Sequence, residues 1–188
     1  MKDHTESQHL VFVVQKHKAT TLLYDFRLEI GGVMPSWAIP KRPTLDSSVK
    51  RLAIPTIDHA LDYRHFEGVL SEEAYGAGPV MIWDEGTYTP ERERDKGERE
   101  EITDRTEAEA VMRKGLEEGK LTFRLSGKKL QGSFALIRIR GFGGKASWLL
   151  IKQHDEYTQK GYDANDYDVS AVSGRSLAQI AAQPASPP

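Results

Sequence analysis

The stretch Leu22-Leu23-Tyr24-Asp25-Phe26-Arg27-Leu28-Glu29 alternates in hydropathy almost without a break. Because successive side chains of a β-strand point to opposite faces, this pattern predicts a strand with two unlike faces. The face expected to enter the core carries Leu22, Tyr24, Phe26 and Leu28. The other face carries Leu23, Asp25, Arg27 and Glu29. Its side chains are spaced roughly 7 Å apart, which suits a metal ion and a phosphate bound side by side.

Short apolar segments separated by turn signals surround this stretch and predict a mainly β (α+β) fold. Gly31-Gly32 predicts a hairpin that joins residues 22–29 to residues 33–39. Two short helices are expected, one opened by a capping box at Thr106 and ended by Gly119, the other over residues 176–182. Further strands are expected over residues 10–16, 51–54, 67–70, 80–83, 121–125, 130–140 and 148–152. We therefore expect a compact antiparallel β-barrel with short flanking helices.

Length and composition indicate one globular domain with short tails. The chain has 188 residues, of which 38% are hydrophobic and 29% are charged, enough apolar material for one core. We expect a flexible arm over residues 1–8, the barrel domain over residues 9–183 and a flexible tail over residues 184–188. The charged segment of residues 91–104 is expected to be a solvated, mobile loop.

Charge and residue usage exclude several classes of function. A net charge of -2 argues against wrapping of duplex DNA by charge alone, so contact with nucleic acid is expected at an end or at a single phosphate. The chain has no cysteine, which excludes thiol catalysis, disulfides and thiolate zinc sites and fits a reducing cytosol. No apolar run is long enough to span a bilayer. We expect a cytoplasmic monomer with no membrane association.

Several polar residues have the chemistry of a phosphate-processing site. His17, Asp25 and Glu29 are possible metal ligands, and imidazole with carboxylate suits manganese, zinc or iron. Arginine presents a planar fork of donors that matches phosphate oxygens. His59 has the chemistry of a general acid or a phosphate ligand, and Tyr63 that of a hydrogen-bond donor. The simpler alternative is a set of ordinary surface charges, with Tyr63 packed on the core. The cations that we consider are Arg27, Lys41 and Arg51.

Taken together, the motifs of the chain resemble those of one family, the 3′-phosphoesterase domain of bacterial DNA ligase D. The resemblance covers about residues 9 to 183. It is carried by Phe12-Val13-Val14-Gln15-Lys16-His17, Tyr24-Asp25-Phe26-Arg27-Leu28-Glu29, Ser36-Trp37-Ala38-Ile39-Pro40-Lys41, Lys50-Arg51-Leu52-Ala53, Asp58-His59, Leu61-Asp62-Tyr63, Phe66-Glu67-Gly68, Tyr75-Gly76-Ala77-Gly78, Ile82-Trp83-Asp84, Gly127-Lys128-Lys129-Leu130-Gln131-Gly132 and Trp148-Leu149-Leu150-Ile151-Lys152.

The resemblance implies a β-barrel that trims DNA 3′ ends in non-homologous end joining. Such an enzyme removes a 3′-terminal ribonucleoside and then the 3′-phosphate with manganese or a similar divalent metal. DNA or RNA-tipped DNA 3′ ends would be the substrates, and a DNA ligase and Ku the partner proteins. His17 and Asp25 would be metal ligands. Catalytic roles would fall to His59, Arg27 and Arg51, and phosphate binding to Arg27, Lys41, Arg51, His59 and Tyr63.

The chain departs from the family pattern at Leu23, where the family has a histidine that is the third metal ligand. Leucine cannot coordinate a metal. The metal would then be held more weakly by two residues and water, or another residue would substitute, with Glu29, His9 and His65 as the possibilities. We expect a phosphoesterase with an altered metal site. The alternative is an inactive module that binds phosphate or DNA ends and acts with a repair ligase.

Overall fold

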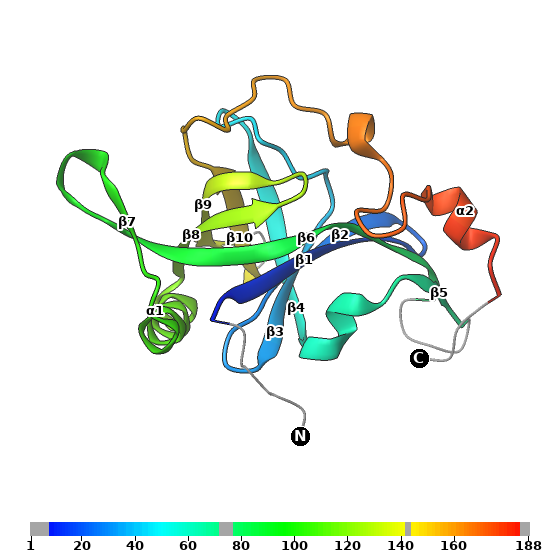
Figure 1. Ribbon diagram of the computed structural model, residues 1–188, viewed down its shortest axis with the longest axis horizontal. Helices are drawn as coiled ribbons and strands as arrows, with labels where there is room; N and C mark the ends of the chain where they lie inside the picture. The colour runs from blue at the N-terminus through cyan, green and yellow to red at the C-terminus, as the bar shows by residue number, and fades with distance from the viewer. Residues whose placement is uncertain (1–7, 72–76, 142–143, 185–188) are drawn as a thin grey trace.

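A computed structural model of the chain describes residues 8–71, 77–141 and 144–184. Most of the expected arm, most of the expected tail and the first part of the predicted bend at residues 75–78 lie outside these ranges. Within them the fold is an antiparallel β-barrel with two short helices (Figure 1). This architecture confirms the predicted fold class.

Eight strands close the barrel. Their order is β1-β2-β3-β4-β10-β9-β8-β6, and β6 pairs back to β1. The two remaining strands pair with the long strand β6, β5 at its first residues and β7 at its last residues. The strands are β1 (Leu10–Lys18), β2 (Leu22–Leu28), β3 (Val33–Ile39), β4 (Lys50–Ala60), β5 (Gly68–Leu70), β6 (Gly78–Glu93), β7 (Arg99–Glu101), β8 (Lys120–Gly127), β9 (Gln131–Arg140) and β10 (Ala146–Lys152).

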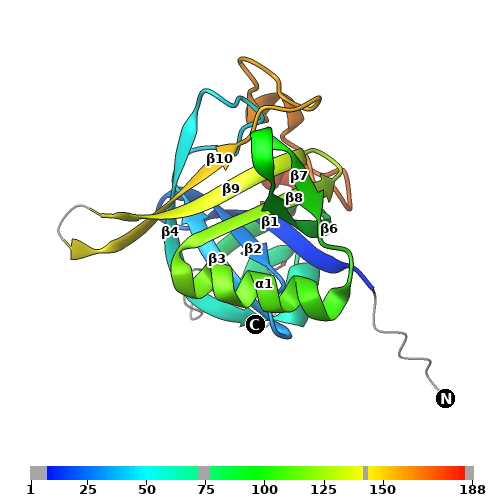
Figure 2. The same cartoon turned by 90° about the vertical axis from the view of Figure 1, so that its left-hand side faces the viewer.

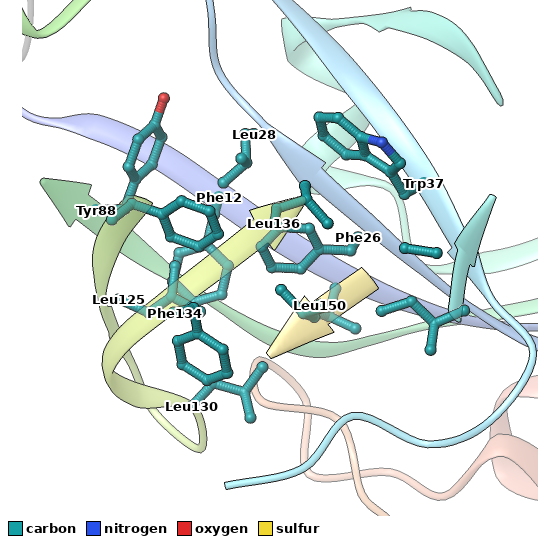
Figure 3. Close-up of a cluster of buried hydrophobic side chains, with 14 of the residues drawn as sticks. Phe12, Phe26, Leu28, Trp37, Tyr88, Leu125, Leu130, Phe134, Leu136 and Leu150 are labelled. Atoms are coloured by element: carbon teal, nitrogen blue, oxygen red, sulfur yellow. The ribbon is translucent and has the colours of Figure 1, made fainter. Parts of the chain in front are cut away.

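The alternating stretch forms β2, and its apolar face enters the barrel core as predicted for three of its four residues. Tyr24, Phe26 and Leu28 are 1%, 0% and 0% exposed. Figure 3 shows Phe26 and Leu28 among aromatic and aliphatic side chains from several strands. The prediction was wrong for Leu22, which is 41% exposed because it lies at the end of β2, paired with the exposed Lys18.

Two helices flank the barrel on opposite sides (Figure 1). Helix α1 (Arg105–Glu118) buries Ala108 and Met112 and packs on β8 and β6. Figure 2 shows the molecule from the side on which α1 lies. Helix α2 (Leu177–Ala181) buries Ile180 and begins at a capping box on Ser176. The predicted end of α1 at Gly119 is confirmed, since Gly119 is left-handed with φ 87°. The described part of the chain contains no helix that could span a bilayer.

The start of α1 and the charged segment before it differ from the prediction. Asp104 caps the helix by accepting a hydrogen bond from the Glu107 backbone N–H, so the cap lies two residues before Thr106. Residues 91–104 do not form a plain loop. The end of β6 pairs with β7 in a two-stranded ribbon that projects from the barrel (Figure 1). Arg94 and Glu100 form an ion pair across this ribbon.

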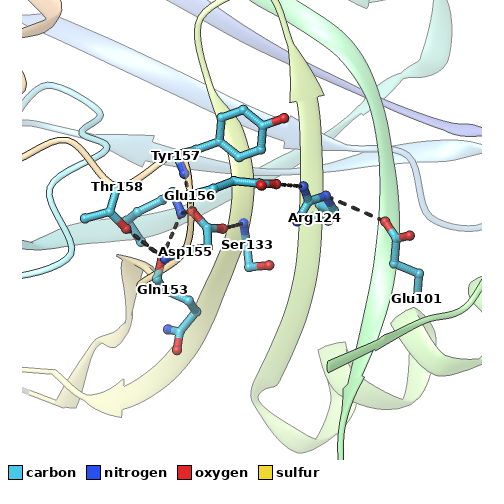
Figure 4. A network of polar contacts seen from close by, with 9 residues as sticks. Glu101, Arg124, Ser133, Gln153, Asp155, Glu156, Tyr157 and Thr158 are labelled. Atoms are coloured by element: carbon cyan, nitrogen blue, oxygen red, sulfur yellow. Dashed lines mark hydrogen bonds and ion pairs between the residues drawn. The ribbon is translucent and has the colours of Figure 1, made fainter. Parts of the chain in front are cut away.

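A loop after β10 is fastened to the outside of the barrel by polar contacts (Figure 4). Asp155 accepts a hydrogen bond from the Ser133 backbone N–H at 2.7 Å and pairs with Lys152 at 2.6 Å. Arg124 of β8 lies between Glu101 and Glu156, at 3.7 and 2.9 Å. These contacts tie the loop to β8, β9 and β7.

Candidate active site

Arg27 lies at the centre of a polar cluster on the outer face of the barrel wall. It points away from the core because its neighbours Phe26 and Leu28 point inward. Its Nε donates to Gln15 Oε1 at 2.7 Å, and its Nη1 lies 3.0 Å from His59 Nδ1. Its Nη2 forms a 3.5 Å ion pair with Asp25. We call Gln15, Asp25, Arg27, His59 and Tyr63 the arginine cluster.

Tyr63 covers Arg27 from the short 3-10 helix η1 (Leu61–His65). The guanidinium carbon of Arg27 lies 5.2 Å from the centre of the Tyr63 ring, a cation–π distance. The His59 and Tyr63 rings are 4.8 Å apart. Arg27 is only 3% exposed, and burial lowers its pKa, although an arginine of this kind keeps its proton. A single buried cation is thus held between two rings, one amide and one carboxylate.

Gln15 positions both Arg27 and η1. The side chain is 0% exposed, and its amide N–H groups donate to the backbone carbonyls of Tyr63 at 2.9 Å and Phe66 at 3.1 Å. Its carbonyl accepts from Arg27, so every strong polar group of the amide is used. Sequence reasoning did not select Gln15. Its signals were its place in the family motif of residues 12–17 and its polar side chain inside an otherwise apolar strand.

His59 reaches the cluster because of a β-bulge. The register between β3 and β4 shifts between Met34 and Ser36, so that Ser36 pairs with Thr56 and Met34 with His59. Three residues of β4 therefore match two of β3. Without the extra residue, His59 would share the inward face of Ala53, which is 0% exposed. The bulge turns His59 to the outer face, where Arg27 lies.

The two contacts of His59 Nδ1 require opposite protonation states. Arginine only donates, so the 3.0 Å contact with Arg27 needs a lone pair on Nδ1 and places the ring proton on Nε2. The 3.0 Å contact of Nδ1 with the Ile57 carbonyl needs a proton on Nδ1. Burial first, and then the charge of Arg27, lower the pKa of His59. The lowered pKa favours the neutral ring near neutral pH. The neutral tautomer with its proton on Nε2 pairs with Arg27, whereas a proton on Nδ1 favours the Ile57 contact.

Replacing Arg27 with methionine is expected to raise the pKa of His59 toward its ordinary value of about 6.5. The change removes the nearby positive charge and lets water approach the ring, and both effects favour the protonated form. NMR titration of the His59 ring protons measures the shift, with Arg124→Met as a control that removes a charge outside the cluster. An unchanged or lower pKa of His59 in the Arg27 variant would contradict this electrostatic account.

His17 and Asp25 lie on the same outer face, diagonally across the β1–β2 ladder. Asp25 pairs with Gln15, and His17 pairs with Leu23. The Nε2 atom of His17 is buried and has no hydrogen-bond partner among the described residues. A buried, unpaired imidazole nitrogen beside a carboxylate fits two ligands of a divalent metal. The position directly opposite His17 carries the apolar side chain of Leu23.

The three residues considered as a replacement ligand lie elsewhere or are engaged. Glu29 is 4% exposed, accepts from the Val11 backbone N–H at 3.2 Å and pairs with Arg105 at 2.8 Å. His9 precedes β1 and is thus at the opposite end of that strand from His17. His65 is exposed at the end of η1. In the described ranges no three His, Asp or Glu side chains gather to hold a metal.

The structure does not bring the other two predicted phosphate ligands into the arginine cluster. Lys41 is exposed just beyond the end of β3. Arg51 and His59 are eight positions apart on β4, which corresponds to roughly 26 Å of extended strand. Arg51 lies two residues from the inward-facing Ala53 and therefore on the same side of β4, whereas His59 faces outward. Arg51 and His59 therefore lie too far apart to bind the same phosphate.

The family of the chain follows from comparison with known proteins. A family model, described as the DNA ligase D 3′-phosphoesterase domain, matches residues 15–138. The chain belongs to this family. The matched range includes every member of the arginine cluster as well as His17 and Leu23.

Similar proteins are much longer than this member of the DNA ligase D 3′-phosphoesterase family. The multifunctional non-homologous end joining protein LigD of Pseudomonas aeruginosa is 45% identical over 146 residues, which are 78% of this chain and 15% of that protein. The LigD repair protein of Mycobacterium tuberculosis is 38% identical over 152 residues, 81% of this chain and 17% of that protein. The chain thus spans about a sixth of the length of these relatives.

Proposed function

We propose that the chain is a divalent-metal-dependent phosphoesterase that removes 3′-phosphate and 3′-ribonucleoside groups from DNA ends during non-homologous end joining. The observation that carries this proposal is the buried Arg27, which contacts both His59 and Asp25. The unpaired Nε2 of His17 on the same face adds a second reason. Membership of the family gives the reaction type.

The charges of the site favour a phosphate only when a cation is also bound. Without one, the charges of Arg27 and Asp25 cancel. With a divalent ion on neutral His17 and ionised Asp25, the ion, Arg27 and Asp25 together would carry a net charge of +2. A phosphate monoester carries about -1.5 to -2 at neutral pH, so its charge would then be matched. Asp25 would also share its charge with the ion, which frees Nη2 of Arg27 to bind a phosphate oxygen.

The protein residues would bind and orient the phosphate. Arg27 would donate two N–H groups to phosphate oxygens and neutralise charge that develops in the transition state. His59, protonated on Nε2 when it pairs with Arg27, would donate a hydrogen bond to a phosphate oxygen or to the departing O3′. Water adds to phosphorus as the bond to the leaving oxygen breaks, and that oxygen takes up a proton. The leaving oxygen would be O5′ of the ribonucleoside in the first reaction, which leaves a 3′-phosphate, and O3′ in the second, which yields a 3′-hydroxyl and free phosphate. A bound divalent metal supplies Lewis-acid polarisation of the phosphoryl oxygen.

Trimming of a primer with a 3′-phosphate or a 3′-terminal ribonucleotide tests the proposal. With manganese present, the wild type is expected to convert both ends to a 3′-hydroxyl, and a chelator is expected to stop both reactions. His17→Ala and Asp25→Ala should lose the activity, whereas a chain with His65→Ala should keep it. Full activity in both the His17 and Asp25 variants would refute the metal role of these residues.

Leu23 favours a second candidate function, an inactive module that binds phosphate or DNA ends and acts with a repair ligase. The side chain opposite His17 cannot bind a metal, and His17 and Asp25 have no third such donor beside them in the described ranges. For this module, affinity for a 3′-phosphate end should survive the chelator and fall in Arg27→Ala. Trimming by the wild type in manganese would exclude it.

A further inference from the structure

We propose that a pocket around Arg51 binds a second phosphate of the nucleic-acid strand, at a distance from the phosphate that is cleaved. This inference rests on the proposed function, because it assumes a strand whose 3′ end lies at the arginine cluster. It gives Arg51 a role that its separation from His59 permits. The sequence predicted that Arg51 binds the phosphate that is cleaved. The present inference keeps phosphate binding as the role of Arg51 and assigns it to a different phosphate.

The pocket is a defined concave site with a volume of about 270 Å³, several times the roughly 30 Å³ that one water occupies in the liquid. It lies where the segment between β3 and β4 meets the chain after β10. Its polar lining consists of Arg42, Thr44, Asp46, Arg51, Tyr162 and Asp163. None of these residues belongs to the arginine cluster.

Two guanidinium groups face this pocket. The Nε of Arg51 donates to the Arg42 backbone carbonyl at 2.7 Å, which fixes the direction of the side chain. With the residues that the structure describes, the two terminal nitrogens of Arg51 make no hydrogen bond or ion pair. Among the described residues, the guanidinium of Arg42 has one ion pair, a long 3.8 Å contact with Asp163. Both arginines thus keep donors for an incoming anion.

The carboxylate of Asp46 is already satisfied and supports the pocket wall. It accepts from the Ser48 hydroxyl at 2.6 Å and from the backbone N–H groups of Ser48 and Gly161, both at 2.9 Å. The bond from Gly161, then those from Ser48, hold the pKa of Asp46 at about 2. Burial, and then repulsion from Arg42, lower the pKa of Arg51. An anion between the two arginines would relieve this repulsion.

The position of the pocket suits a nucleic-acid strand that runs along β4 from the outward-facing His59 and turns over the end of β4 at Arg51. Arg51 and His59 are separated by roughly 26 Å of strand, and phosphates follow one another about every 3.4 Å along a duplex strand. A phosphate in the pocket would therefore belong to a nucleotide several positions from the 3′ end. The pocket would let the enzyme prefer ends on longer strands.

Binding of two probes with manganese present, compared between His59→Ala and His59→Ala with Arg51→Met, tests the inference, because loss of the proposed catalytic His59 removes the dependence on turnover. One probe is a nucleoside 3′-phosphate, which has one phosphate, and the other is a DNA strand of about twelve nucleotides with a 3′-phosphate. Arg51→Met is expected to weaken binding of the long probe by about tenfold, and that of the short probe far less. The slope of log affinity against log salt should fall by about 0.7 for the long probe. Arg42→Met, at an exposed site, should give the same pattern.

Arg92→Met is the matched control, because it removes an exposed arginine on the projecting ribbon and should change neither probe. Equal weakening of both probes by Arg51→Met would place Arg51 at the cleaved phosphate and overturn the inference. Unchanged binding of the long probe in both pocket variants would also overturn it. Failure of the proposed function is seen separately, as a wild type that binds both probes and trims neither in manganese.

Discussion

Arg27→Met is expected to lower the rate of 3′-phosphate removal by about 10³-fold, which corresponds to about 4 kcal/mol of transition-state stabilisation. The guanidinium is the buried cation that touches His59 and Asp25 together, and methionine fills a similar volume without donors. Phosphate release from a 3′-phosphate primer, measured under manganese saturation, gives the rate. Retention of more than a tenth of the wild-type rate would contradict the central role of Arg27.

Lysine is not expected to restore the function of Arg27. The Nε of Arg27 is engaged by Gln15, and the two terminal nitrogens point toward His59 and Asp25. A lysine ammonium is a point charge on a flexible stem and cannot keep this three-way geometry. We expect Arg27→Lys to stay at least about tenfold below the wild type.

A control separates loss of chemistry from loss of folding. Removal of Arg27 leaves the buried Gln15 carbonyl unpaired, which costs about 1 to 3 kcal/mol. Thermal unfolding of each variant shows whether the rate was measured on folded protein. Arg124→Met removes a strand arginine that bridges Glu101 and Glu156 (Figure 4), and should leave the rate unchanged.

The alternation of β2 was sufficient to predict which of its residues enter the core and which face the site. Tyr24, Phe26 and Leu28 pack inside, while Asp25 and Arg27 point outward, since an extended strand allows no other arrangement. The failure at Leu22 has a local cause, because the strand ends there. Strand periodicity describes the middle of a strand better than its last residue.

The arrangement of His59 and Gln15 depends on features that a single sequence does not reveal. A bulge changes the face on which His59 lies, and nothing in residues 56–59 marks where an extra residue is accommodated. The role of Gln15 depends on two carbonyls about fifty positions away in the chain. Such contacts exist only once η1 has packed on the barrel.

The charged segment before α1 shows how composition was misread. Its many charges indicated a solvated loop, yet both faces of a two-stranded ribbon can be solvated while its backbone is hydrogen-bonded. The cross-strand pair of Arg94 and Glu100 is compatible with this ribbon. Solvation was predicted correctly for most of these side chains but not for Glu91 and Ile102, which are buried. Solvation also does not exclude a strand.

Leu23→His is expected to tighten manganese binding by at least about tenfold. Position 23 pairs directly with His17 on the outer face, two residues from Asp25, so an imidazole there would add a third protein ligand to the proposed metal pair. Loss of even an indirect support of a metal ligand commonly changes affinity by about 10 to 100-fold. Calorimetric titration with manganese measures the affinity, and trimming at limiting manganese should become faster.

Leu22→His is the matched control for this variant. It makes the same chemical change one residue away, at a side chain that is 41% exposed and alternates to the other face of β2. It should leave both manganese affinity and rate unchanged. If Leu23→His also changes neither, another group already completes the metal site. The wild type could also prove unable to trim the primer. If Leu23→His then binds manganese more tightly but still does not trim, the inactive module is favoured, because the missing ligand would not be the only obstacle to activity.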